Sequence, residues 1–158
     1  MCGVIFIIMR VIYLILVCFL FKFNVMSQES KLNNPSKLTI EFIKDYKKWN
    51  DFAYNLSQTN TNDEKIEIEY KKIISKYCQS SKTHQGISYG SNSSHCPDQE
   101  KIIKEVIKKN KAIITTKFRD KEFDYLESDY EYHFIKVDEK WFLEEIYLID
   151  EEGKYEGI

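Results

Sequence analysis

The sequence predicts one α+β domain in which two amphipathic helices pack on an antiparallel sheet. Two patterns indicate this class. Between Leu38 and Cys78, apolar side chains recur every three or four residues, as on the buried face of a helix. From about residue 98 onward, short apolar runs are separated by polar turns, as in the strands of an antiparallel sheet. Helices that precede a run of strands favour helices packed on one face of a curved sheet.

The first 27 residues differ in character from this domain. Their long apolar run could span a membrane, but Arg10 lies inside it. If translation starts at Met9, a short basic region precedes the apolar stretch 11–21 and a cleavage site at 25–27. We expect residues 1–27 to be a signal peptide or a membrane anchor, which would make the protein exported or membrane-tethered. The alternative is a cytoplasmic protein with a misassigned start.

The helical region is expected to contain two helices after a polar linker over residues 28–37. An aromatic and apolar stripe predicts the first helix over Leu38–Leu56, and the polar residues that follow it end the helix. Thr61 and Glu64 then have the spacing of a capping box. A second apolar stripe continues to about Cys78. Two helices joined by such a short connection should pack antiparallel.

The clearest strand signal is a β-hairpin over Tyr130–Ile149. Tyr130, Tyr132 and Phe134 alternate with other side chains at the period of two that a half-buried strand requires. Residues 138–140 form a short polar turn before a second aromatic and β-branched run. A hairpin is marginally stable alone, so further strands or a packed helix are needed.

Two more strands are expected before this hairpin. The stretch 98–109 suits either a helix or a strand, and we favour a strand because residues 109–111 read as a turn before the β-rich run Ala112–Phe118. After the hairpin, Glu151–Lys154 is expected to form a final turn, which leaves Tyr155–Ile158 as a short tail.

A long polar segment, Gln79–Pro97, separates the helices from the strands. Within it, Gly86–Gly90 could form a short strand or a pair of turns. A loop of this length without periodicity is usually functional or mobile, and loop residues carry function more often than core residues do. This segment is therefore the first candidate contact surface.

Cys78 and Cys96 lie at the two ends of this loop. In an oxidising compartment they could form a disulfide that closes 17 intervening residues, and such a bond would contribute about 3 kcal/mol. In a reducing cytosol both would be free thiols. His84 and His95 lie nearby, but the spacing of the four residues fits no zinc motif. We expect no metal and no other cofactor.

The overall composition excludes several function classes. Of 158 residues, 43% are hydrophobic and 30% are charged, which is typical of a globular domain with a separate apolar end. Only five glycines argue against a glycine-rich phosphate loop, and a net charge of −2 argues against nucleic acid as the partner. The charge is uneven, because residues 119–158 hold 14 acidic and five basic residues whereas residues 28–118 hold 11 acidic and 16 basic. The acidic part is either a solvated rim or a face for a basic partner.

Six short segments, in this order and spacing, resemble the bacterial immunity proteins of the nuclear transport factor 2 fold. They are Ile87–Ser91, Ser94-His95, Glu100–Ile103, Asp129–Tyr132, Lys140–Ile146 and Asp150–Glu156. The resemblance covers Thr39–Ile158. It implies a nuclear transport factor 2-like cone over residues 38–158, with the helices packed on a curved antiparallel sheet. It also implies that the chain binds a cognate toxin and blocks it by occlusion. Homodimers are common for this fold, so the resemblance also allows a homodimer.

The resemblance supplies no catalytic residues, so the partner-binding residues are predicted from charge and aromatic character. Neighbouring residues of a strand face opposite ways, and for this reason Glu144 and Glu145 cannot both contact the partner. The predicted partner-binding residues are Tyr89, Glu144, Glu145, Asp150, Glu151, Glu152 and Tyr155.

The alternative function is a small enzyme of the same fold, such as an isomerase or a dehydratase, acting on a molecule held in the cone. A strand histidine is more often structural than catalytic, and aromatic residues more often line a core than a substrate cage. A roomy cone with a buried carboxylate or histidine against a tyrosine would favour the enzyme, whereas a cone filled by its own aromatic rings would count against it. The candidate catalytic residues are Arg119, Asp129, Tyr130, Tyr132 and His133.

Overall fold

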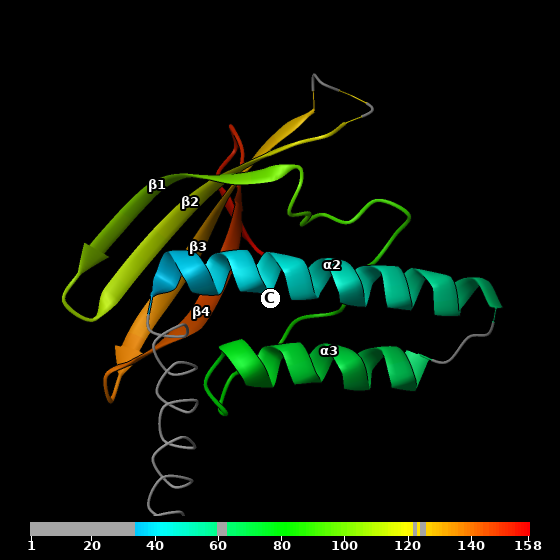
Figure 1. Cartoon of the computed structure of the whole chain (residues 1–158), viewed down its shortest axis with the longest axis horizontal. Helices are drawn as coiled ribbons and strands as arrows, with labels where there is room; N and C mark the ends of the chain where they lie inside the picture. The colour runs from blue at the N-terminus through cyan, green and yellow to red at the C-terminus, as the bar shows by residue number, and fades with distance from the viewer. Residues whose placement is uncertain (1–33, 60–62, 122, 124–125) are drawn as a thin grey trace, which may run out of the picture.

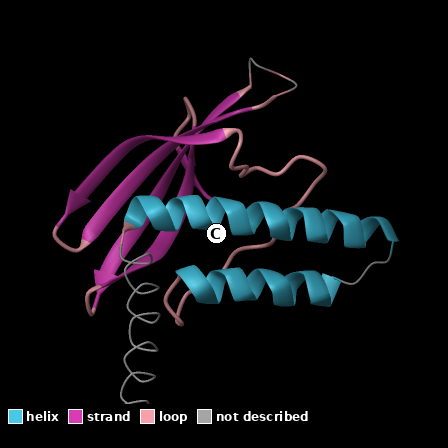
Figure 2. Cartoon of the chain, viewed as in Figure 1, coloured by secondary structure: helices cyan, strands magenta, loops and turns pink. Residues whose placement is uncertain are grey.

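The computed structural model describes residues 34–59, 63–121, 123 and 126–158. In this part of the chain, two helices precede five strands, which form one antiparallel sheet in the order β1-β2-β3-β4-β5. The elements are α2 (Pro35–Thr59), α3 (Asp63–Tyr77), β1 (Glu100–Lys108), β2 (Lys111–Arg119), β3 (Glu127–Val137), β4 (Lys140–Ile149) and β5 (Lys154–Glu156). The two helices run antiparallel beside each other, with the curved sheet next to them (Figures 1 and 2). The predicted α+β fold is therefore confirmed.

Helix α2 begins earlier than the sequence pattern predicted. It starts at Pro35 and not at Leu38, so the predicted linker over residues 28–37 extends too far. Proline suits the first turn of a helix because its missing N–H needs no partner there. The Asn34 side chain accepts a hydrogen bond from the backbone N–H of Lys37 at 3.0 Å, which caps the helix.

Two other predictions fall on residues that the structure does not describe. The leader over residues 1–27 lies outside the described part of the chain, as does Thr61 of the predicted capping box. The assignment of residues 1–27 as a signal peptide or membrane anchor stays a prediction. Neither α2 nor α3 is long and apolar enough to cross a membrane, and the same holds for every helix within the residues described.

The helices pack through the aromatic stripe that the sequence indicated. Phe42 and Ala53 of α2 and Ile66 of α3 are completely buried. The indole N–H of Trp49 donates to the backbone oxygen of Ile66 at 3.1 Å, and the Trp49 ring lies 4.7 Å from that of Tyr70, centroid to centroid. Burying Trp49 in this way satisfies its only polar atom, so the antiparallel packing costs no unpaired donor.

Both hairpins have tight turns with left-handed backbone. Lys109 lies between β1 and β2 with φ of 49°, and the two residues between β3 and β4, Asp138 and Glu139, have φ of 47° and 64°. Val137 and Lys140 face each other across this second turn. Two consecutive positive φ values give the twist that joins antiparallel strands with a two-residue loop. Asp tolerates this conformation better than Glu does.

The sheet places its buried residues in register on the face toward the helices. Ile114, Tyr132 and Ile146 are neighbours on β2, β3 and β4, and all three are buried. Phe134 and Leu143 form the next buried pair. This alternation confirms the hairpin that the sequence predicted over Tyr130–Ile149.

The chain after β4 differs from the predicted tail. Residues 154–156 pair with β4 as a fifth strand, following a turn in which Gly153 has φ of 148°. Ile158 then returns to the core and is buried. The approach is close, because the Gly157 N–H donates to the backbone oxygen of Ile146 at 2.8 Å and a Cβ on Gly157 would lie 3.2 Å from that oxygen.

Candidate functional site

Three of the predicted partner-binding carboxylates gather in the turn between β4 and β5, which we call the acidic turn (Asp150, Glu151 and Glu152). One side-chain oxygen of Asp150 accepts the backbone N–H groups of Glu152 at 2.8 Å and Gly153 at 3.0 Å, so Asp150 holds the turn in place. Glu151 and Glu152 are exposed. Tyr155 follows on β5, is 44% exposed, and donates from its hydroxyl to Glu152 at 3.4 Å. The turn thus presents two carboxylates beside an accessible ring.

Glu144 and Glu145 point in opposite directions, as predicted. The strand register shifts between His133 and Phe134, which face Glu145 and Leu143 respectively, so Glu144 is the extra residue of a β-bulge. Glu144 is exposed, whereas Glu145 is buried. Glu145 is therefore wrongly predicted as a partner contact.

The Glu145 carboxylate instead joins three parts of the fold. One oxygen accepts the backbone N–H groups of Ile146 and Ile158, both at 3.0 Å. The other accepts the Lys82 ammonium at 2.7 Å, with both side chains largely buried. A buried carboxylate with three donors stabilises the fold only while every donor is in place. Glu145 consequently holds both the loop that carries Lys82 and the end of the chain against β4.

Tyr89 is less accessible than the prediction required. Its side chain is half-buried and packs against the core, where its ring meets that of Trp49 edge-on with centroids 6.1 Å apart. Tyr89 is therefore a packing residue of the loop and not an exposed anchor. The stretch around it, residues 86–90, forms neither the short strand nor the turn pair that the sequence allowed.

Cys78 and Cys96 are both buried free thiols, so the predicted disulfide is not formed in this structure. Cys78 belongs to the main core cluster, whereas Cys96 lies outside it and accepts the backbone N–H groups of Gln99 and Glu100 with its own carbonyl oxygen. Burial raises the pKa of the Cys78 thiol to about 11, despite the nearby Lys82 ammonium. A thiol that stays protonated at neutral pH is a poor nucleophile.

A polar cluster that the sequence did not predict lies buried between the loop and the sheet. Glu100 accepts the hydroxyl hydrogens of Thr116 at 2.6 Å and Tyr132 at 2.7 Å on one oxygen, and its other oxygen lies 2.9 Å from Nδ1 of His95. The Tyr132 oxygen also lies 2.9 Å from that nitrogen. Because the Tyr132 hydrogen is directed at Glu100, the arrangement requires a hydrogen on Nδ1 of His95. We call these four residues the inner polar cluster.

Aromatic rings of the protein pack around the inner polar cluster. The rings of Tyr130, Tyr46 and Phe42 lie 4.6, 4.9 and 6.1 Å from the His95 ring, centroid to centroid. Burial, together with the negative charge of Glu100, raises the pKa of Tyr130 to about 12. The same two causes raise the pKa of Tyr132 well above its ordinary value. Both phenols are therefore protonated at neutral pH and can act as hydrogen-bond donors, but not as bases.

The remaining candidate catalytic residues do not join this cluster. Nε2 of His133 lies 2.8 Å from the Glu131 carboxylate, which also accepts the Lys154 ammonium at 2.6 Å. Although partial burial opposes the shift, these two hydrogen bonds lower the pKa of Glu131. Asp129 pairs with Lys117, and Arg119 pairs with Glu127, as exposed or half-exposed ion pairs. Of the five predicted residues, only Tyr132 belongs to the inner polar cluster, and Tyr130 packs beside it.

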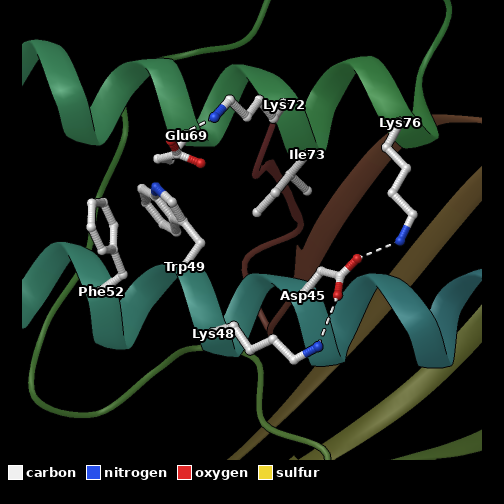
Figure 3. A pocket seen from close by; sticks show the side chains of 8 residues that line it. All are labelled: Asp45, Lys48, Trp49, Phe52, Glu69, Lys72, Ile73 and Lys76. Carbon is white, nitrogen blue, oxygen red and sulfur yellow. Dashed lines mark hydrogen bonds and ion pairs between the residues drawn. The ribbon is translucent and has the colours of Figure 1, made fainter.

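A groove of about 400 Å³ runs between the two helices (Figure 3). Its lining combines an apolar floor with a charged rim, formed by Trp49, Phe52 and Ile73 and by Asp45, Lys48, Glu69, Lys72 and Lys76. The rim charges pair with one another, since Asp45 accepts Lys76 at 2.5 Å and Lys48 at 3.4 Å, and Glu69 accepts Lys72 at 2.6 Å. The groove therefore presents a nearly balanced charge and supplies no strong ionic site.

Charge is distributed unequally over the two edges of the sheet. The β1–β2 hairpin, residues 100–119, holds seven basic and two acidic residues, whereas residues 140–158 hold six acidic and two basic residues. Because β1 and β5 are the two outer strands, these opposite charges lie at opposite edges. No group of His, Cys, Asp and Glu in the described ranges is arranged to hold a metal ion.

The comparisons with known proteins agree with this geometry. A family model described as NTF2 fold immunity protein matches residues 34–156, which includes both helices and all five strands. No curated protein and no solved structure gives a significant match. The matched region spans most of the chain, and it contains the acidic turn and the inner polar cluster. We conclude that this chain belongs to the NTF2 fold immunity protein family.

Proposed function

We propose that this protein neutralises a toxin protein by binding it through the acidic turn and thereby occluding it. The membership in an immunity protein family supports a toxin as the partner. We choose the acidic turn as the binding surface because two exposed carboxylates, Glu151 and Glu152, lie next to the accessible ring of Tyr155. Tyrosine is enriched among the side chains that dominate the binding energy of protein interfaces, and carboxylates beside it add complementarity to a basic partner.

The charge distribution defines the kind of toxin surface that fits. A basic surface would be attracted to the acidic edge of the sheet and repelled by the basic β1–β2 hairpin at the opposite edge. The two edges would therefore orient the partner before contact. When carboxylates of this chain contact lysine or arginine side chains of the partner, they form charge-assisted hydrogen bonds, which are stronger than neutral ones. Toxin domains that act on nucleic acid or lipid headgroups have basic surfaces of this kind.

The experiment is a survival assay. The chain is co-expressed with the protein encoded by the open reading frame next to its gene, which the proposal takes to be the toxin. Survivors are counted for the wild type and for the double variant Glu151→Lys with Glu152→Lys. We expect wild-type rescue and a large loss of rescue in the double variant. Unchanged rescue by this variant would exclude the acidic turn, and absence of rescue by the wild type would exclude the proposed function.

A matched control separates a local effect from a general change in charge. Asp138 and Glu139 form another exposed acidic pair in a tight turn, at the other end of β4. Reversing both to lysine changes the net charge by the same amount as the acidic-turn variant. We expect this control to keep its rescue. Equal loss in the two variants would mean that overall charge, and not the acidic turn, decides binding.

The inner polar cluster favours a second candidate function, an enzymatic one. A buried carboxylate beside a histidine and a tyrosine is an arrangement that enzymes use for proton transfer. Against this, three aromatic rings pack on His95 and the pKa values of both tyrosines are raised. The variant Tyr132→Phe distinguishes the two functions. If it stays folded and binds the toxin but no longer rescues cells, catalysis is required; retained rescue favours binding alone.

A further inference from the structure

The long connection between α3 and β1, residues 78–99, is held to helix α2 by buried polar side chains. We call it the α3–β1 loop. The Asn50 side chain is 1% exposed, and its amide both donates to the Gly90 oxygen at 2.9 Å and accepts the Gly90 N–H at 3.1 Å. The Tyr46 hydroxyl donates to the Ser88 oxygen at 3.3 Å and accepts from Ser94 at 3.2 Å. The loop therefore runs along α2 in a fixed path (Figure 1).

The sheet holds the same loop at two other points. His95 joins it to three strands through the inner polar cluster, and Lys82 joins it to β4 through the buried Glu145 carboxylate. Burying so many polar groups is favourable only if each finds its partner. Here the partners are the loop's backbone and its charged residues, so these core positions fix a segment that has no regular secondary structure of its own.

The outward side of this loop has a uniform chemistry. Ile87 and Tyr89 pack inward against the core. Apart from Pro97 and Asp98 near its end, the exposed residues are small or uncharged polar ones: Gln79, Ser80, Ser81, Thr83, Gln85, Gly86, Ser88, Ser91, Asn92 and Ser94. Hydroxyl and amide side chains can donate or accept hydrogen bonds, and a loop that is already ordered loses little conformational entropy when it binds.

The loop is continuous with the acidic edge of the sheet. The Gln85 amide donates to the Glu156 carboxylate of β5 at 3.0 Å. On its other side, the loop forms one wall of a cavity of about 510 Å³, whose opposite wall includes Ile66 and the carboxylates Asp63 and Glu67 of α3. A surface that combines carboxylates with a recessed apolar floor suits the methylene groups and the charged end of a lysine or arginine.

We propose that the outward side of the α3–β1 loop, from Thr83 to Ser91, is a second and preorganised part of the toxin-binding surface. It contacts basic side chains of the toxin protein, next to the contact made by the acidic turn. This inference rests on the proposed function. It predicts that the loop keeps one conformation in the free and the bound protein, because the core already determines its path.

Gly86 offers a substitution site that leaves the fold undisturbed. A Cβ built on Gly86 meets no atom within 4 Å, and its φ lies outside the left-handed region. Gly86→Arg and Gly86→Glu add side chains of comparable length and opposite charge at the edge of the cavity. Binding of each variant to the purified product of the neighbouring open reading frame is measured by titration calorimetry. We expect Gly86→Arg to weaken binding about tenfold or more, and Gly86→Glu to bind at least several times more tightly than Gly86→Arg.

A bulky control and a salt series complete the test. Gly86→Trp should also weaken binding, whereas Lys104→Trp on the exposed β1 edge should leave the Kd within about twofold. The difference between Gly86→Arg and Gly86→Glu should shrink as salt rises. If all Gly86 variants bind like the wild type while the acidic-turn reversal weakens binding, the loop is not part of the interface and the proposed function stands. If the wild type does not bind, both proposals are wrong.

Discussion

The carboxylate of Glu145 accepts three hydrogen bonds in the interior, whereas that of Glu151, two residues beyond the end of the same strand, is exposed to solvent. Glu100 resembles Glu145, since it is also buried and has three hydrogen-bond partners, which for Glu100 are all side chains. A buried carboxylate with several donors from distant segments fixes the relative position of those segments. An exposed carboxylate keeps its hydration until a partner displaces it. The two kinds of glutamate therefore have different effects when they are removed.

This difference separates stability from recognition within one small domain. The interior carboxylates hold the α3–β1 loop and the end of the chain on the sheet. The exposed carboxylates add little to folding because surface charges contribute little to stability. Variants of the first kind should change the free energy of unfolding, and variants of the second kind should change the affinity for the toxin.

The largest effect is expected for Glu100→Ala. It leaves the hydroxyl groups of Thr116 and Tyr132 and the Nδ1–H of His95 without their acceptor in a buried site. We expect the free energy of unfolding to fall by about 3 kcal/mol, as measured by urea denaturation. The control is Glu105→Ala, which removes an exposed glutamate from the same strand and should change it by less than about 0.5 kcal/mol. Similar losses in both variants would show that the inner polar cluster is not stabilising.

The next largest effect is expected for Glu145→Ala. The substitution leaves the Lys82 ammonium and the Ile158 N–H without the carboxylate that accepts both. We expect the free energy of unfolding to fall by about 2 kcal/mol. Amide hydrogen exchange should show faster exchange at Ile158 and in the loop around Lys82. Glu144→Ala is a control one residue away, because Glu144 is exposed on the bulge. If Glu144→Ala is as destabilising as Glu145→Ala, the assignment of the two side chains to opposite faces is wrong.

The sequence predicted the elements whose pattern is local. The hairpin of β3 and β4 could be read from the alternation of Tyr130, Tyr132 and Phe134, and the helices from their apolar stripes. Local patterns suffice here because neighbouring residues alone determine which face of an element is apolar. The start of α2 was missed by three residues, since the capping role of Asn34 depends on geometry that an Asn-Pro pair does not specify.

The sequence did not predict the inner polar cluster or the role of Glu145. His95 and Tyr132 are 37 positions apart, and Lys82 and Glu145 are 63 positions apart. Such contacts depend on the register of the sheet and on the path of the loop. The β-bulge at Glu144 also shifts which residues of β4 face the core. The exposed carboxylates of the predicted acidic face, Glu144, Asp150, Glu151 and Glu152, could be chosen from charge, and their role in binding stays a prediction.

A smaller effect is expected from neutralising the acidic turn. Glu151→Gln combined with Glu152→Gln removes two charges and keeps the side-chain size. At low salt we expect the toxin to bind about fivefold to tenfold more weakly, which corresponds to about 1 kcal/mol. The effect should shrink at high salt because exposed charges are screened. The free energy of unfolding should stay within about 0.5 kcal/mol of the wild type. A salt-independent loss of affinity would mean that shape and not charge determines this contact.

The smallest effect is expected for Asp45→Asn, because this carboxylate is only partly buried and so lies between the two kinds. Asp45 of α2 accepts the Lys76 ammonium at 2.5 Å and the Tyr77 hydroxyl at 2.9 Å, both from α3 (Figure 3 shows the Lys76 pair). Although partial burial opposes the shift, these hydrogen bonds lower the pKa of Asp45 below its ordinary value of 3.8. Because solvent screens this group, we expect the free energy of unfolding to fall by only about 0.5 kcal/mol at pH 7.

The pH dependence of this loss follows from the direction of the pKa shift. A lowered pKa in the folded state stabilises the protein fully above the ordinary pKa, and the contribution disappears as the pH falls through the folded value. The difference between wild type and Asp45→Asn should therefore be constant from pH 7 to about pH 5. It should begin to shrink near the ordinary pKa of 3.8 and vanish only when the pH falls below the lower pKa of the folded state. Urea unfolding followed by tryptophan fluorescence, which reports on Trp49 of α2 and Trp141 of β4, measures this difference. Asp51→Asn is the control, because Asp51 pairs only within α2, with Lys47. A difference that persists at low pH would mean that the amide disturbs packing and that the charge of Asp45 does not link the helices.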